Sequence, residues 1–221
     1  MPDCKRNCKV LLSLDLSTSA TGWARFNIET GELLGFGVIE PDYKQPKTEK
    51  GIPKLAYPQL QLQKMRRLCN QMMVLFADDN IEMIVIEEIN RGISRIGQKI
   101  LDSFHFLLLN SLSHDHLMRV SYHDSDGAGG WRSAHGLKLQ LSEVDKAQNK
   151  ITRNINKKRK KGVGKLPVIT QKHLACRWVN KRFGLDLDCD QRPTDGDKSD
   201  AIGLGMFVLI YILGVLKCQN K

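Results

Sequence analysis

Three apolar segments of this chain begin or end at carboxylates, and no other feature of the sequence constrains the fold as strongly. The carboxylates are Asp15 after the run 10–14, Glu87 after the run 84–86, and Asp197 and Asp200 just before the run that starts at residue 201. A carboxylate beside a buried strand or helix is unfavourable unless it is paired or holds a metal ion. We therefore expect these four side chains to act together at one site.

The size and charge of the chain narrow the class of protein. Its 221 residues, 41% of them hydrophobic, suffice for one large domain, or for one domain with a substantial insertion. A net charge of +10 favours nucleic acid or an anionic membrane surface as the partner. The apolar run 201–216 is shorter than the roughly 20 residues that span a bilayer. We expect it to form a buried helix, with no membrane insertion.

The cysteines and the N-terminus bear on the compartment. The six cysteines are scattered and include no CxxC pair, so zinc-ribbon spacing is absent. Free thiols in a reducing compartment are the favoured interpretation. The first residues lack the apolar stretch of a secretory signal. We expect a cytoplasmic protein, with a nuclear or organellar location left open.

The pattern of apolar residues predicts an α/β domain. The segments that read as strands are 10–16, 21–26, 33–39, 81–87 and 117–123. Apolar residues at helical spacing predict helices over 59–78 and 96–112. Thr170 and Gly184 are expected to cap and to end a further helix.

A basic segment lies at about residues 136–168, after the last predicted strand. Four of its cations lie at i, i+4, i+7 and i+11 on one predicted helix face: Lys146, Lys150, Arg153 and Lys157. The opposite side of that helix carries Val144, Ala147, Ile151 and Ile155. A stripe of one charge sign repels itself without a polyanion, which favours phosphate binding. A solvated helix face is the alternative and, for the run 157–161, so is a nuclear-localisation signal.

The four carboxylates have the chemistry of a metal site. Asp197 and Asp200 are spaced i and i+3, on one face of the first turn of a predicted helix, where the helix dipole favours their ionised form. Oxygen-only ligands suit Mg²⁺ or Mn²⁺ better than zinc. Two such ions can activate a water and stabilise the leaving oxygen of a phosphodiester. A site of this kind in a basic chain indicates a nuclease.

The same residues resemble the RuvC family of Holliday junction resolvases. The matching segments, in family order and at family-like separations, are 14–23 (LDLSTSATGW), 84–88 (IVIEE) and 197–201 (DKSDA). The resemblance implies a single nuclease domain over residues 1–221, with an RNase H-like fold whose five-stranded mixed sheet is flanked by helices. The basic helical segment would be an insertion. The segment 129–133 (GGWRS), followed by basic residues, is similar to the phage-type branch, which points to a bacterial or phage-infected host cell.

The resemblance also implies an activity and its partners. It implies a homodimer that binds branched DNA and resolves four-way junctions by paired nicks, with two Mg²⁺ ions (or Mn²⁺) per active site. The helix 96–112 is our candidate for the dimer interface. The catalytic and metal-binding residues would be Asp15, Glu87, Asp197 and Asp200. The residues expected to bind DNA are Arg91, Arg95, Lys99, Arg132, Lys146, Lys150, Arg153, Lys157, Lys158, Arg159, Lys160 and Lys161.

Other functions stay open at this stage. A broader nuclease of this class would also cut forks and other branched DNA. The segment 15–22 is superficially similar to the first phosphate-binding hairpin of actin-like and sugar-kinase-like phosphotransferases, although 221 residues are too few for their two domains. A non-catalytic branched-DNA binding protein would keep the fold, but the presence of all four carboxylates argues against it.

Overall fold

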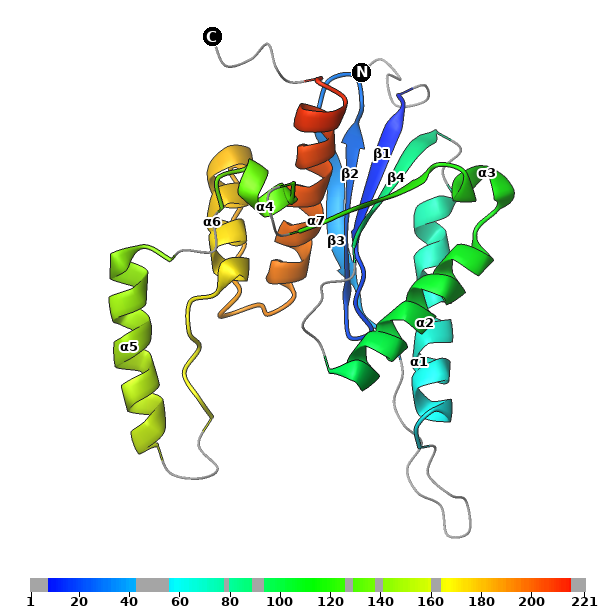
Figure 1. Ribbon diagram of the computed structural model, residues 1–221. Coiled ribbons are helices and arrows are strands. Elements are labelled where there is room, and N and C mark those ends of the chain that lie inside the picture. Colours follow the sequence, from blue (N-terminus) through cyan, green and yellow to red (C-terminus); the bar gives the residue numbers. More distant parts are fainter. Residues whose placement is uncertain are drawn as a thin grey trace.

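The computed structural model describes residues 8–42, 56–77, 80–88, 94–125, 129–137, 141–159 and 164–215. A central sheet has helices on both of its faces (Figure 1). Its strands are β1 (Val10–Asp15), β2 (Thr21–Asn27), β3 (Leu33–Ile39), β4 (Ile81–Glu87) and β5 (Val120–His123). The helices are α1 (Gln59–Met72), α2 (Arg95–Ser111), α3 (His114–Leu117), α4 (Trp131–Ala134), α5 (Glu143–Lys158), α6 (Gln171–Phe183) and α7 (Asp195–Phe207), with a 3₁₀ turn η1 (Met73–Phe76) and a π-helical turn η2 (Val208–Ile212).

The sheet is mixed, and its strand order is β3-β2-β1-β4-β5. The strands β1, β2 and β3 pair antiparallel, whereas β4 runs parallel to both β1 and β5. This confirms the predicted five-stranded mixed sheet flanked by helices. Because Leu14 pairs with Ile86 in the parallel β1–β4 register, the next residues, Asp15 and Glu87, lie at the same edge of the sheet.

The alternation of side chains along β1, β2 and β4 gives the sheet two apolar faces. Toward α1 and α2 it presents Leu12, Leu14, Ile84 and Ile86. Toward α6 and α7 it presents Leu11, Ala24, Phe26 and Val85. The same period of two directs Asp15 and Glu87 toward α7. Glu88 comes one residue later and is exposed.

Close packing brings α7 onto the sheet. A Cβ atom on Gly22 of β2 would lie 2.0 Å from the carbonyl oxygen of Asp197, and one on Gly205 would lie 2.4 Å from an aromatic ring of β2. Ser13 of β1 donates a hydrogen bond of 2.7 Å to the carbonyl oxygen of Ala201. These contacts fix the start of α7, which carries the last two of the predicted carboxylates, against the ends of the strands.

Several element boundaries differ from the sequence-based expectation. The predicted strand 117–123 is wrong at its start, because residues 114–117 form α3, capped by the Ser113 side chain. The helix expected over 59–78 is α-helical only to Met72 and ends in η1. The start of α7 lies at Asp195, two residues before Asp197.

The helix predicted between Thr170 and Gly184 is confirmed. Thr170 and His173 form a capping box at the start of α6, and Gly184 ends it with φ of 66°. The apolar C-terminal run is also helical, but Tyr211 and Ile212 of η2 are 47% and 53% exposed. No helix in the described part of the chain is both long and apolar enough to cross a membrane.

Candidate metal centre

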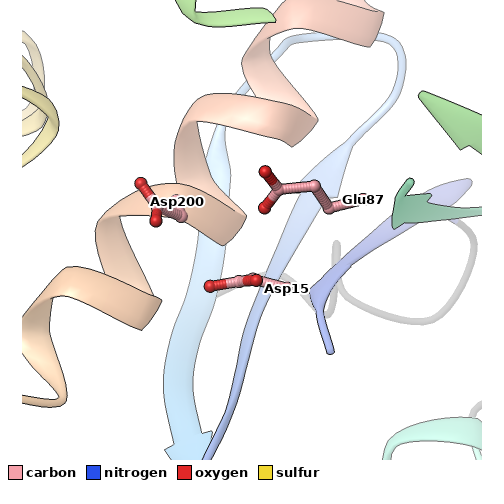
Figure 2. Close-up of side chains that lie close together, drawn as sticks. All are labelled: Asp15, Glu87 and Asp200. Atoms are coloured by element: carbon pink, nitrogen blue, oxygen red, sulfur yellow. The ribbon is translucent and has the colours of Figure 1, made fainter. Parts of the chain in front are cut away.

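Three carboxylates from distant parts of the sequence meet beside the sheet. Asp15 comes from the end of β1, Glu87 from the end of β4 and Asp200 from the second turn of α7 (Figure 2). One carboxylate oxygen of each lies within 4.8 Å of those of the other two. We call these residues the carboxylate cluster. Three of the four residues predicted to form the site are therefore brought together.

Burial makes the carboxylate cluster electrostatically unfavourable without a cation. Desolvation, together with the negative charges of Glu87 and Asp200, raises the pKa of Asp15 well above its usual value. Desolvation also raises the pKa of Asp200 to about 6, although the Arg132 guanidinium opposes this. At neutral pH the ionised carboxylates repel one another because they lie close together. The cluster therefore needs positive charge to balance them.

Two basic side chains supply part of that charge. The Arg132 guanidinium lies 2.8 Å from an oxygen of Asp200 and 3.6 Å from an oxygen of Glu87. Lys172 of α6 pairs with Asp197, and its ammonium lies 3.9 Å from Asp200. Burial by itself lowers the pKa of Lys172, but the negative charges of Asp200 and Asp15 outweigh burial and raise it. Both cations thus help to keep the carboxylates ionised.

The fourth predicted ligand, Asp197, lies at the margin of the carboxylate cluster. It is one turn before Asp200 on α7, and its carboxylate is hydrogen-bonded to Lys172. Its charge still contributes to raising the pKa of Asp15. The structure thus keeps Asp197 near the site but outside the three-residue group.

The donor set fits a hard divalent cation. All three side chains of the carboxylate cluster offer oxygen, the ligand atom that Mg²⁺ and Mn²⁺ prefer. One oxygen of Asp200, Oδ1, is buried and has no hydrogen-bond partner among the described residues. A buried, unsatisfied carboxylate oxygen is unfavourable unless something binds it.

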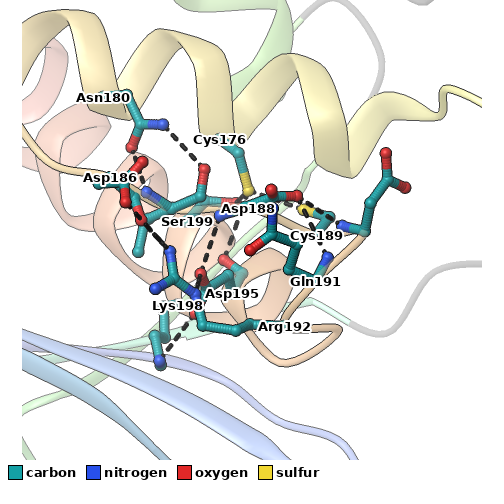
Figure 3. Close-up of polar contacts among 12 residues, drawn as sticks. Cys176, Asn180, Asp186, Asp188, Cys189, Gln191, Arg192, Asp195, Lys198 and Ser199 are labelled. Carbon is teal, nitrogen blue, oxygen red and sulfur yellow. Dashed lines mark hydrogen bonds and ion pairs between the residues drawn. The ribbon is translucent and has the colours of Figure 1, made fainter.

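A polar network holds the start of α7 (Figure 3). Asp195, 1% exposed, accepts hydrogen bonds from the backbone of Asp188 at 2.8 Å and from the side chain of Arg192 at 2.7 Å. Lys198 donates to the same carboxylate at 2.8 Å. These contacts lower the pKa of Asp195 despite its burial. Asp195 therefore anchors the helix that carries Asp197 and Asp200.

The residues predicted to bind DNA fall into separate groups. Arg95 and Lys99 are exposed on the first turns of α2. Arg132 is only 7% exposed, because it lies inside the carboxylate cluster and stacks over the ring of the fully buried Trp131, 4.6 Å from its centroid. Three others lie outside the described residues: Arg91, Lys160 and Lys161.

The remaining predicted DNA-binding residues lie on or just after α5, which stands at the edge of the molecule beyond α6 (Figure 1). The exposed ones are Lys146, Lys150, Arg153, Lys157 and Lys158. Arg159 is half-buried and hydrogen-bonds to the carbonyl oxygen of Gly164. The predicted helix and its basic face are therefore present, at a distance along the molecule from the carboxylates.

The inner face of α5 is polar. Its buried residues are Asp145, Asn149 and Thr152, whereas the apolar Val144, Ile151 and Ile155 are 79%, 54% and 44% exposed. The Asn149 side chain donates to the carbonyl of Ile169 at 2.8 Å and accepts from its N–H at 2.7 Å. The apolar pattern correctly predicts a common face, but that face is exposed.

Sequence reasoning missed the roles of two cations beside the carboxylate cluster. The sequence predicts Arg132 as a DNA-binding residue and predicts no role for Lys172, because in a basic chain a single Arg or Lys resembles a surface residue. The one signal for Arg132 was its neighbour Trp131, since an aromatic residue in a glycine-rich turn is suited to close packing. Trp131 contacts α7, where a Cβ atom on Gly203 would lie 2.3 Å from its ring.

No protein-family model matches the chain, and no curated protein matches it. Among solved structures, the chain is similar to T. thermophilus RuvC in complex with a Holliday junction substrate, at 10% identity over 94% of this chain and 97% of that chain, with a TM-score of 0.48. A further Thermus thermophilus RuvC structure matches at 11% identity, over 93% of this chain and 97% of that chain, with a TM-score of 0.49. Fowlpox virus resolvase in complex with Holliday junction DNA matches at 11% identity, over 92% of this chain and 99% of that chain, with a TM-score of 0.45.

The fold of this chain is specified by its own strand order and strand directions, β3-β2-β1 antiparallel and β1-β4-β5 parallel. With helices on both faces of that sheet, the chain has the RNase H-like fold that its resemblance to the RuvC family implies.

Proposed function

We propose that this protein is a Mg²⁺-dependent endonuclease that resolves four-way DNA junctions by paired, symmetric nicks. The observation that carries the proposal is the meeting of Asp15, Glu87 and Asp200, with oxygens within 4.8 Å of one another, in a chain of net charge +10. A partly buried group of three carboxylates needs cations, and a basic chain favours a polyanion. The motifs shared with the RuvC family support junction DNA as that polyanion.

Each residue of the site has a proposed role. Asp15, Glu87 and Asp200 would hold the metal, and Asp197, which is paired with Lys172 in this structure, would be the fourth ligand. Two Mg²⁺ ions, or Mn²⁺, would supply an activated water and stabilise the leaving oxygen of the phosphodiester. Arg132 and Lys172 keep the carboxylates ionised and oriented.

The proposed path of the DNA uses the exposed cations. Arg95 and Lys99 come shortly after the strand that ends at Glu87, which suits them to phosphates near the scissile bond. The α5 stripe of Lys146, Lys150, Arg153 and Lys157 is proposed to bind phosphates on a more distant arm of the junction. Contacts of this type position the DNA without reading its sequence.

Cleavage of a fixed four-way junction, a fork and a linear duplex, each with and without Mg²⁺, tests this function. We expect paired nicks in the junction that require Mg²⁺, and binding with little turnover in Ca²⁺ because its looser coordination positions water poorly. Glu87→Gln should abolish the nicks, whereas Glu88→Gln should retain them because that exposed neighbour points away from α7. Equal cleavage of all three substrates would indicate a broader nuclease without junction specificity. Binding of ATP without nicking of any substrate would favour a phosphotransferase.

We further propose that the active form is a two-fold dimer, because resolving a junction requires two nicks on opposing strands. Support comes from α2, on which Ile96 and Phe106 are 63% and 72% exposed. Phe106 also lines a cleft of about 510 Å³ between α1 and α2.

Sedimentation should give twice the 25.0 kDa chain mass. Phe106→Glu should yield monomers that nick one strand, whereas Val74→Glu, at an exposed apolar residue of η1, should stay dimeric. A wild-type monomer that makes paired nicks would refute the dimer.

A further inference from the structure

Two cysteines meet at the corner between α6 and α7. Cys176 lies on α6 and is 3% exposed, and Cys189 lies in the connecting loop 184–194 and is half-buried. Their sulfur atoms are 2.8 Å apart (Figure 3). Both are free thiols. Neither takes part in the proposed nuclease chemistry.

Hydrogen bonds around the pair attach the loop that carries Cys189 to α6 and α7. The Asn180 side chain donates to the carbonyl of Leu187 at 2.9 Å and accepts from its N–H at 2.8 Å, which ties the loop to α6 on one side of Cys189. In addition, Asp195 binds the backbone of Asp188. The loop is thus fixed by contacts that do not involve sulfur, and these contacts set the approach of the two thiols.

The separation of the sulfurs suits a covalent bond better than a shared metal ion. A disulfide bond is about 2.05 Å long, so forming one requires the two sulfurs to approach by less than 1 Å from the present contact. Two thiolates on a tetrahedral zinc ion, each about 2.3 Å from the metal, would stand roughly 3.8 Å apart. The described residues also place no third His, Cys or carboxylate ligand atom beside the two sulfurs, as a tetrahedral zinc site would require.

We propose that Cys176 and Cys189 are a reversible dithiol–disulfide pair that reacts with small-molecule disulfides. One thiolate attacks the small disulfide, which forms a mixed disulfide and releases the first small thiolate. The second cysteine then attacks the sulfur of the first, and the second small thiolate leaves. In total, two protein thiols are oxidised by two electrons, and one small disulfide is reduced to two thiols.

The environment of the pair is consistent with this exchange. Cys189 is half-buried, and so offers access that the buried Cys176 lacks. The contact between the two thiols lowers the pKa of Cys176, which burial only partly opposes, and raises the pKa of Cys189. The thiolate is the reacting species in exchange, so Cys176 supplies the more reactive sulfur of the pair, in contrast to the isolated buried Cys69, whose pKa is raised to about 11 by desolvation.

The proposed disulfide would brace the corner that carries part of the metal site. Cys176 lies one helical turn after Lys172, and its sulfur contacts the carbonyl of Asp195 at 3.5 Å and the hydroxyl of Ser199 at 3.4 Å. Oxidation would close the short loop between α6 and α7 with little movement of either helix. We therefore expect the oxidised protein to be more stable and its proposed metal site to be unchanged.

Titration of the folded, intact chain with oxidised and reduced glutathione tests the pair. On oxidation, the intact mass should fall by the mass of two hydrogens. Trypsin should then release residues 173–177 linked by a disulfide to residues 183–198, and reduction should separate the two peptides. The melting temperature should rise by roughly 6–12 °C, the shift expected for a loop of this length in a domain of this size. Cys189→Ser should show neither the linked peptides nor the rise, and Cys69→Ser should show both.

The result is decisive in either direction. Linked peptides that form in the folded chain and revert with reduced glutathione establish the pair. Failure to form them in the folded wild-type chain, with formation only after denaturation, would overturn it, as would an equal rise in melting temperature in Cys189→Ser. Because the readouts are mass, peptide linkage and melting temperature, they are independent of the proposed nuclease activity.

Discussion

The carboxylate cluster and α5 both carry the charges that suggested a function, yet they are held in opposite ways. The cluster joins β1, β4 and α7, and the close approach of α7 to the sheet depends on the absence of a side chain at Gly22. The helix α5 is attached through polar groups, chiefly Asn149 to the backbone of Ile169 and Asp145 to Arg177 at 3.0 Å. It leaves both its basic and its apolar face exposed.

This difference fits the two tasks that we propose. Metal chemistry needs oxygen atoms fixed to within a fraction of an ångström, and close packing of sheet and helix provides such precision. Phosphate binding tolerates displacement, because charge attraction acts over a Debye length of about 8–10 Å. A helix held by a few hydrogen bonds is sufficient for that purpose.

The largest expected effect comes from removing one charge of the carboxylate cluster. Asp15→Asn should lower cleavage by at least roughly 10²–10³-fold, the loss typical of removing one group that stabilises developing charge. Junction binding should be retained or tightened, because the variant no longer places that negative charge opposite the phosphates. Near-normal nicking by this variant would contradict the site.

The same variant makes a prediction about stability. The raised pKa of Asp15 means that folding disfavours its ionised form, so this group weakens the metal-free protein as pH rises above about 4. Asp15→Asn should therefore raise the melting temperature of the metal-free protein at pH 7.5, by about 2–4 °C if 1 kcal/mol is recovered. Calorimetry in a chelating buffer measures it, and an unchanged melting temperature at both pH 7.5 and pH 4 would contradict the electrostatic account.

The next largest effect is expected from a substitution that disturbs the packing of α7 on the sheet. Gly22→Ala places a Cβ atom 2.0 Å from the carbonyl oxygen of Asp197, which the sheet and helix cannot accommodate without moving apart. We expect the unfolding free energy to fall by about 1–3 kcal/mol, together with reduced metal affinity. Gly129→Ala is the matched control, since nothing lies within 4 Å of its Cβ position. Equal effects of the two changes would show that the approach of α7 is not critical.

A smaller effect is expected from neutralising the basic face of α5. Changing Lys146, Lys150, Arg153 and Lys157 to Gln should weaken binding to branched DNA and reduce the slope of log K against log salt by about 0.9 for each phosphate that is no longer bound. Cleavage at saturating protein should stay nearly unchanged. Changing Lys64 and Arg66 on α1 is the control. An unchanged salt slope would mean that this face meets something other than DNA.

The smallest effect should come from the apolar face of the same helix. Ile151 is 54% exposed, so Ile151→Ser should change the unfolding free energy by no more than about 0.5 kcal/mol. A matched change in the core, Ile202→Ser, should cost several times more because Ile202 is fully buried. Chemical denaturation compares the two, and a large destabilisation at Ile151 would indicate that another surface covers this face.

The fold and much of the carboxylate cluster could be predicted from sequence because they depend on local patterns. The runs that end at Asp15 and Glu87 are strands, and the period of two along a strand decides which face each carboxylate takes. The spacing of Asp197 and Asp200 places both on one helix. No pattern of that kind distinguishes which of these two enters the cluster, since this depends on the competing bond between Asp197 and Lys172.

Features that depend on contacts between distant residues escaped prediction. Arg132 reaches Asp200 and Glu87 only because α4 follows β5 and folds back over α7. The contact between Cys176 and Cys189 depends on a loop whose course is set by hydrogen bonds from Asn180. The polar inner face of α5 contradicts the usual pairing of apolar residues with burial, and so no periodicity could have revealed it.

Direct titration of the purified protein with Mn²⁺, followed by calorimetry at pH 7.5 and pH 5, tests the central claim that this carboxylate cluster holds a divalent cation. Binding requires ionised carboxylates, and the pKa of Asp200 is raised to about 6, so affinity should be clearly weaker at pH 5. We predict tight, pH-dependent binding by the wild type and by Glu88→Gln, and no binding by Glu87→Gln. Equal Mn²⁺ affinity of the Glu87 and Glu88 variants, or affinity that does not change between the two pH values, would contradict the account.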